Sequence, residues 1–196
     1  MGVVTTSKNI WTTHELHNQR RHDRPLRGLD SSLRSSPVLR ALRPIGVRME
    51  FIDSQKSISE EDLLSVEEKI GFELPSEYKS FLLKHNGGSP ALDGVRHNNE
   101  HFDYVGYFYA VRDEMYHDDL VRQIKEHEGM VPANYLPIGE SPGGDVFCIS
   151  LKGESKGAVF HWDHEEANYD GEPWEYNMTK LSPSLNQFLK DLCVGE

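Results

Sequence analysis

Residues 58–88 read ISEEDLLSVEEKIGFELPSEYKSFLLKHNGG, and this stretch contains clear signals for where helices start and stop. Ser59 is suited to cap a helix, because its hydroxyl accepts a hydrogen bond from a free backbone N–H of the first turn. Gly71 ends that helix, since glycine adopts a left-handed backbone without strain. Pro75 then fixes the first turn of a second helix, which the Asn86-Gly87-Gly88 triplet ends. The stretch therefore predicts two short helices.

Apolar residues recur along both helices at the spacing of one helix face. In the first helix Leu63, Val66 and Ile70 form a narrow stripe, and we expect Leu64 to widen it. The buried face of the second helix is formed by Tyr78, Phe81 and Leu82. Each helix is thus predicted to bury one side and expose the other.

The same residues resemble a known family. The resemblance lies in an acidic capped helix, a Gly-Phe-x-Leu-Pro link at 71–75, Tyr-Lys-x-Phe-Leu at 78–82 and a closing Asn-Gly-Gly. Residues 136–162, LPIGESPGGDVFCISLKGESKGAVFHW, are similar to the central hairpin of that family. The chain resembles the SUKH superfamily, SMI/KNR type, over roughly residues 50–193, and the order of the motifs is more specific than any one of them.

This resemblance implies an α+β domain without an active site of its own. Many bacterial members are immunity proteins against secreted toxins, and fungal relatives are interaction hubs in cell-wall regulation. We expect an antiparallel or mixed sheet of about five to six strands, flanked by about four helices, because strands here cluster between helices without βαβ alternation.

Further elements follow from local patterns. The aromatic stretch 102–111 predicts one strand that is covered on both faces, and residues 92–96 suit a short strand. A third helix is expected after Asp118-Asp119, and a C-terminal helix after Ser182-Pro183. Three more strands are expected at residues 135–138, 145–151 and 158–162.

Residues 1–48 differ from the rest of the chain in charge and composition. They hold nine basic residues against three acidic ones, a net charge of +6, which leaves −17 for residues 49–196 because the whole chain carries −11. We predict a basic, disordered segment at 1–48 and one folded domain at 49–196. A domain this acidic repels nucleic acid directly and suits a basic protein partner.

Cysteine content and hydropathy indicate the compartment. Cys148 and Cys193 lie far apart without metal-ligand spacing, which is typical of reduced thiols rather than of a disulfide framework. No apolar run reaches the roughly 20 residues that span a bilayer. We therefore expect a cytoplasmic protein that does not insert into a membrane.

Gly139-Glu140-Ser141-Pro142-Gly143 matches the G-x-S-x-G pattern of serine hydrolases. A nucleophile elbow needs a strand, a sharp turn and then a helix. Here residues 143–145 lead into an expected strand, so a tight turn between strands explains the motif better. A serine-dependent hydrolase remains an alternative, which Ser141→Ala tests.

Residues 161–166, HWDHEE, offer a second alternative, a site for a divalent metal ion. His161 and Asp163 would face one side of a continuing strand, and His164 or Glu166 could complete the ligand set. The family pattern requires no metal or other cofactor at this place. A strand end that runs into a solvated loop is the simpler interpretation.

The stretch 162–176, WDHEEANYDGEPWEY, mixes aromatic residues with six acids. Trp and Tyr often anchor protein interfaces, and acidic side chains at the rim steer a basic partner. A buried Trp162 with a merely solvated loop is the competing interpretation. We predict as partner contacts Trp162, Asp163, Glu165, Glu166, Asp170 and Trp174.

The sequence thus favours an immunity protein, or antitoxin, that neutralises a cognate, basic toxin, for instance a nuclease. A regulatory scaffold of the fungal cell-wall type and a metal- or serine-dependent hydrolase are the alternatives. We expect no catalytic residues and no cofactor.

Overall fold

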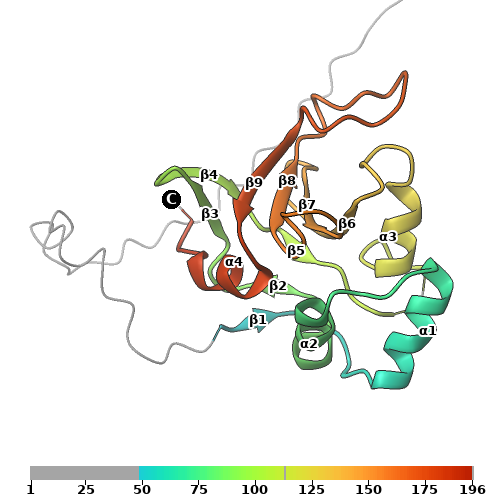
Figure 1. Cartoon of the computed structure of the whole chain (residues 1–196). Helices are drawn as coiled ribbons and strands as arrows, with labels where there is room; N and C mark the ends of the chain where they lie inside the picture. The colour runs from blue at the N-terminus through green and yellow to red at the C-terminus, as the bar shows by residue number, and fades with distance from the viewer. Residues whose placement is uncertain (1–48, 113, 196) are drawn as a thin grey trace, which may run out of the picture. The chain divides into compact units, whose positions relative to one another are not determined.

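The computed structural model describes residues 49–112 and 114–195. The predicted basic segment 1–48 lies outside the described residues, so the description concerns the acidic domain alone. In the described part of the chain, four helices accompany a five-stranded antiparallel sheet and two small two-stranded sheets (Figure 1). The predicted α+β class is confirmed.

The helix pair forms as predicted, with α1 at Glu60–Ile70 and α2 at Ser76–His85. The Ser59 hydroxyl accepts a hydrogen bond from the Asp62 backbone N–H at 3.3 Å, and the Asp62 carboxylate accepts one from the Ser59 N–H at 2.8 Å. This reciprocal capping box satisfies two donors that a helix start leaves free. Both helices end in a left-handed residue, Gly71 at φ 80° and Asn86 at φ 44°.

The buried faces of the two helices also follow the apolar spacing, with one exception. Leu63 and Val66 of α1 are buried, as are the three residues predicted for α2, namely Tyr78, Phe81 and Leu82. Leu64 was predicted to widen the α1 stripe, and this prediction is wrong, because its side chain is exposed to solvent. An α-helix turns about 100° per residue, so the residue after Leu63 already points away from the core.

The main sheet has the strand order β5-β6-β7-β8-β9, with every neighbouring pair antiparallel. The strands expected at residues 135–138, 145–151 and 158–162 are confirmed as β6, β7 and β8. The edge strand β9 was not predicted. The strands are β5 at Tyr107–Phe108, β6 at Tyr135–Glu140, β7 at Val146–Ser150, β8 at Val159–Trp162 and β9 at Met178–Ser182.

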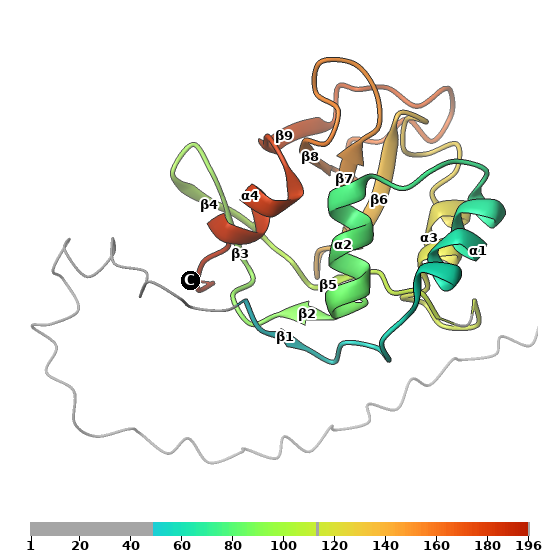
Figure 2. The same cartoon turned by 60° about the horizontal axis from the view of Figure 1, so that its bottom comes forward.

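The two faces of the central strand β7 enter two different cores. Phe147 and Ile149 point to the core to which all four helices contribute, whereas Val146 and Cys148 point to a smaller core on the opposite face. The helices α3 (Leu120–Glu126) and α4 (Leu185–Asp191) complete the layer that contains α1 and α2 (Figure 2). The sheet is therefore covered by helices on one face and by irregular chain on the other.

The predicted single strand at 102–111 is wrong in one respect: it is two strands that belong to different sheets. β4 (Glu100–Tyr104) pairs with β3 (Gly94–His97), whereas β5 joins the edge of the main sheet. The strand is interrupted at Gly106, where a Cβ atom would lie 2.9 Å from the Glu140 carbonyl oxygen. Only glycine lets the backbone approach so closely, and the break frees β4 to form a separate hairpin.

The small sheet pairs β1 (Phe51–Ile52) with β2 (Ser89–Pro90). Because β1 precedes α1 and β2 follows α2, this pairing brings together the two ends of the segment that contains the helix pair. Both cysteines, Cys148 and Cys193, are free thiols. Among the helices that the structure describes, none has the length and apolar character needed to cross a membrane.

Candidate functional site

The loop between β8 and β9, residues 163–177, is hereafter called the acidic loop; it is the orange segment that projects beyond the strands at the top of Figure 1. Its two ends are joined by hydrogen bonds. The Asp163 N–H donates to the Asn177 carbonyl oxygen at 3.0 Å, and the Asn177 side-chain amide donates to the Asp163 carbonyl oxygen at 2.7 Å. Loops with such closely held ends form compact units whose own side chains order them.

Hydrogen bonds inside the acidic loop hold its shape. The Asp163 carboxylate accepts from the backbone N–H groups of Glu165 at 2.9 Å and Glu166 at 3.3 Å. The Trp174 indole N–H donates to the Glu166 carbonyl oxygen at 3.0 Å, across the loop. The Tyr169 hydroxyl donates to the His164 carbonyl oxygen at 2.9 Å. A surface that is ordered before binding loses less entropy when a partner arrives.

The outer surface of the acidic loop combines negative charge with exposed rings. The loop contains six acids and no lysine or arginine. No ion pair between described residues includes one of these acids with a lysine or arginine. Three aromatic side chains are exposed on the same loop, namely Tyr169, Trp174 and Tyr176. Exposed aromatic rings amid uncompensated acids are suited to a basic partner with an apolar centre.

The structure places the predicted contact residues in three different environments. Glu165, Glu166, Asp170 and Trp174 are exposed on the acidic loop. Asp163 is partly buried, and its carboxylate orders the first turn of the loop. The prediction for Trp162 needs correction, because this side chain is only 2% exposed and has no surface to offer a partner.

Trp162 belongs to the smaller core, where it anchors the start of the acidic loop. Trp162 packs there with residues of β7 and β8. Ala167, within the acidic loop, and Met178, directly after it, contact the same cluster. The ring of His127 meets the Trp162 ring edge-on at a centroid distance of 6.0 Å. Trp162 is buried because it is the last residue of β8 and its side chain points to the face of the sheet that the smaller core covers.

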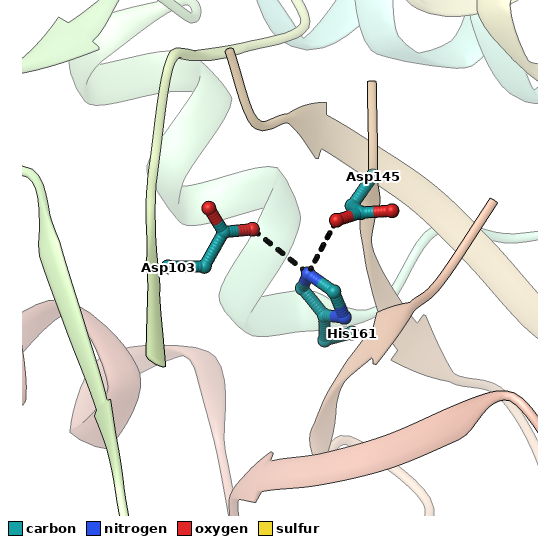
Figure 3. Close-up of side chains that lie close together, drawn as sticks. All are labelled: Asp103, Asp145 and His161. Carbon is teal, nitrogen blue, oxygen red and sulfur yellow. Dashed lines mark hydrogen bonds and ion pairs between the residues drawn. The ribbon is translucent and has the colours of Figure 1, made fainter. Parts of the chain in front are cut away.

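A polar cluster lies near the root of the acidic loop and consists of Asp103, Asp145 and His161 (Figure 3). The His161 Nε2 atom lies 2.8 Å from Asp103 Oδ2 and 3.5 Å from Asp145 Oδ2. The second oxygen of Asp145, Oδ1, lies 2.7 Å from His164 Nδ1. One carboxylate thus contacts two imidazole rings.

Protonation in this region follows from these contacts. Burial raises the pKa of Asp103, but hydrogen bonds from the His161 ring and the Tyr104 N–H lower it by more, so the pKa of Asp103 is below its ordinary value. The hydrogen bond to Asp145 raises the pKa of His164 above its ordinary value, and the neighbouring negative charges add to this effect. The Asp103 carboxylate is therefore held in its charged form.

The predicted metal ligands are brought together in a different combination from the expected one. His161 groups with Asp103 and Asp145, whereas Asp163 groups with Asp145 and His164. Glu166 belongs to neither group of the described residues. Asp103 and Asp145 were missed, because each lies on a separate segment and no spacing in the sequence links them to His161.

Comparison with known proteins identifies the family. The model of the SMI1/KNR4 family (SUKH-1) matches residues 57–191, which is more than half of the chain. The chain belongs to the SMI1/KNR4 family. This family includes immunity proteins. A curated relative, the SPbeta prophage-derived uncharacterized protein YokK of Bacillus subtilis (strain 168), is 27% identical over 128 residues, a match that covers 56% of this chain and 64% of the relative.

In this SMI1/KNR4 domain, Ser141 of the G-x-S-x-G match lies in a turn between two strands. The turn joins β6 to β7, and the Ser141 hydroxyl accepts from the backbone N–H groups of Gly143 at 3.1 Å and Asp145 at 3.2 Å. A strand follows the serine where a nucleophile elbow requires a helix. The predicted turn is confirmed, and the Ser141 hydroxyl serves to hold its shape.

Two exposed aromatic residues of the acidic loop, Tyr169 and Tyr176, were not among the residues predicted to contact a partner. Their signal was present, since both are aromatic residues in an acidic stretch without strand or helix periodicity. Trp162 is also aromatic and lies in the same stretch, so composition alone could not separate buried from exposed rings.

Proposed function

We propose that this protein is an immunity protein that binds and neutralises a cognate bacterial toxin in the cytoplasm. Membership of the SMI1/KNR4 family supports this function, because the family includes immunity proteins. The observation that carries the proposal is the acidic loop, an ordered surface with six acids, three exposed aromatic rings and no basic side chain other than His164. Such a surface suits a basic partner.

The mechanism of neutralisation is steric and electrostatic. A nuclease toxin must present a positive surface to bind the phosphates of its substrate. The exposed acids, among them Glu165, Glu166 and Asp170, would attract that surface over a distance of about 10 Å at moderate salt. Trp174, Tyr169 and Tyr176 would then pack against the apolar part of the toxin and exclude substrate from its site.

Neutralisation by binding needs no chemistry from the immunity protein. The Ser141 hydroxyl is used within a turn, so we expect Ser141→Ala to cost about 1 kcal/mol of stability and to leave protection intact. A folded Ser141→Ala protein that no longer protects cells would contradict a binding mechanism and support a hydrolase.

The proposal is tested by determining whether a toxin domain is encoded beside the gene for this protein and by co-expressing the two. Cells that express the toxin alone should stop growing, and cells that also express the full chain should grow. The purified pair should form a stable complex, in which the toxin no longer cleaves its substrate. Growth arrest despite well-expressed, folded protein, together with no complex in solution, would refute the immunity function for this pair.

A further inference from the structure

Three side chains that are far apart in the sequence converge on one point beside the acidic loop. Asp103 comes from β4, Asp145 from the turn that leads into β7, and His161 from β8 (Figure 3). Their ligand atoms, one imidazole nitrogen and two carboxylate oxygens, all lie within 4.8 Å of one another. Ligands supplied by three separate segments are held by the fold itself rather than by one flexible loop.

Two carboxylates compete for one imidazole nitrogen within this triad. His161 is only 5% exposed, and both carboxylates face its single Nε2 atom. One N–H can make a short hydrogen bond to only one of them, and it does so with Asp103 at 2.8 Å, leaving Asp145 at 3.5 Å. One imidazole N–H cannot satisfy two carboxylates at once, whereas a divalent cation placed between them would interact favourably with both.

The carboxylates are oriented so that one oxygen of each remains directed at the centre. Asp103 Oδ1 accepts from the Tyr104 N–H at 2.7 Å, which leaves Oδ2 facing His161. Asp145 Oδ1 is bound by the His164 N–H at 3.0 Å and by His164 Nδ1 at 2.7 Å, which again leaves Oδ2 facing His161. Surrounding hydrogen bonds that fix ligand orientation are typical of metal sites.

We propose that Asp103, Asp145 and His161 bind a divalent transition-metal ion, either Zn²⁺ or Mn²⁺. A ligand set of one imidazole and two carboxylates suits these ions, whereas Mg²⁺ and Ca²⁺ favour oxygen ligands alone. Water would fill the remaining positions, because the side chains of Asp103 and Asp145 are 17% and 22% exposed and open the site to solvent. The His161 proton would then reside on Nδ1, since Nε2 gives its lone pair to the ion.

The bound ion would join two parts of the fold that the sheet ladders do not join, the β3–β4 hairpin and the five-stranded sheet. β4 forms a separate two-stranded sheet with β3, so Asp103 links that hairpin to the five-stranded sheet through its side chain. An ion at this place would also hold Asp145 and, through it, His164 at the start of the acidic loop. Metal binding should therefore stabilise the folded chain, because the unfolded chain offers no assembled site.

The test is a calorimetric titration of the metal-free, tag-free full chain with ZnCl2 and, separately, with MnCl2. We expect one ion per chain at the triad and a higher melting temperature in its presence. Asp103→Asn and Asp145→Asn should each weaken this binding about 10–100-fold. Asp170→Asn removes an exposed acid of the nearby acidic loop and should bind as the wild type does. His14, His17 and His22 can bind the same ions. The triad is therefore identified as the site by weaker binding in the Asp103→Asn and Asp145→Asn variants than in the wild type.

A second measurement needs no variant and so does not depend on how the variants fold. In a ¹⁵N-labelled wild-type chain, Zn²⁺ should shift the backbone signals of Tyr104, Asp145 and His164. The signals of the hairpin loop at 153–157, at the opposite end of β7 and β8, should stay in place. Absence of shifts at the triad up to millimolar Zn²⁺ and Mn²⁺, or wild-type affinity in both folded Asn variants, would overturn the proposal.

Discussion

The helix pair at 58–88 and the acidic loop at 163–177 are both rich in acids, but they use them differently. In the helix pair, the Asp62 carboxylate caps α1, and Glu67 accepts the Leu74 N–H at 2.7 Å while it pairs with Lys79 at 3.2 Å. In the acidic loop every acid except the partly buried Asp163 is exposed to solvent, and none has a lysine or arginine partner among the described residues. Paired acids contribute to stability, whereas unpaired ones remain available to a partner.

Aromatic residues show the same contrast between the two regions. Tyr78 and Phe81 of α2 are buried in the large core, while Tyr169, Trp174 and Tyr176 of the acidic loop are exposed. The rings of α2 are already surrounded by apolar atoms, so their free energy of burial is gained on folding. The rings of the acidic loop would gain theirs only on binding. Variants should therefore separate stability from partner binding.

The largest expected effect is the loss of stability in Phe81→Ala. The Phe81 ring packs against Phe51 and Phe108 at centroid distances of 5.4 and 5.1 Å, and its removal leaves a cavity in the large core. We expect the free energy of unfolding to fall by about 3–5 kcal/mol, measured by urea denaturation. Leu64→Ala, an exposed change in the same helix pair, is the control and should cost less than about 1 kcal/mol. If Phe81→Ala and Leu64→Ala lowered the free energy of unfolding equally, the buried faces of α1 and α2 would not be the ones described above.

The second-largest effect is expected for Trp174→Ala in the acidic loop, which should weaken partner binding more than stability. The variant should lose about 2 kcal/mol of toxin binding, close to a 30-fold rise in Kd, because an exposed indole is a typical interface anchor. Its stability should change by less than about 1.5 kcal/mol, since folding loses one hydrogen bond, to the Glu166 carbonyl oxygen. Calorimetric titration with the purified toxin measures the binding. Ile52→Ala, an exposed apolar change on β1, serves as control.

Unchanged toxin affinity in a folded Trp174→Ala protein would remove this ring from the interface. The same loss in the Ile52→Ala control would instead point to a general effect of exposed apolar area.

A smaller effect is expected for the double variant Glu165→Lys and Glu166→Lys. The association rate with a basic toxin should fall about tenfold, or more at low salt, because the charge that steers the partner is reversed. Surface plasmon resonance at two salt concentrations measures this rate. The control Glu68→Lys with Glu154→Lys changes net charge equally at exposed positions outside the acidic loop. If both double variants associate equally slowly, net charge rather than this loop steers the toxin.

The smallest expected effect is that of Ser59→Ala on the helix pair. The variant loses the side-chain acceptor for the Asp62 N–H and should be destabilised by about 1 kcal/mol, measured by thermal or urea unfolding. Ser57→Ala, an exposed change just before the cap, should leave stability unchanged. Toxin binding should be unaffected in both, because the cap acts on the helix pair alone. A stability loss shared by both variants would contradict the capping role.

Much of this domain was predictable because its signals are local. Ser59, Gly71 and Asn86 mark helix ends through hydrogen bonds and backbone angles within a few residues. The alternation of Phe147 and Ile149 with Val146 and Cys148 assigned two faces to β7 before any neighbour was known. The charge and aromatic content of the acidic loop were likewise visible in its composition.

Local patterns in the sequence were enough to predict the helix pair, the strands β6 to β8, the family and the acidic, aromatic character of the proposed interface. The three-dimensional arrangement was needed to establish that Trp162 is buried while Trp174 is exposed and that residues 102–111 divide between two sheets. It was also needed to show that Asp103 contacts His161, which lies 58 positions away in the sequence. The physical reason is range: capping and periodicity act between residues a few positions apart, whereas burial and side-chain convergence depend on which distant segments the fold brings together.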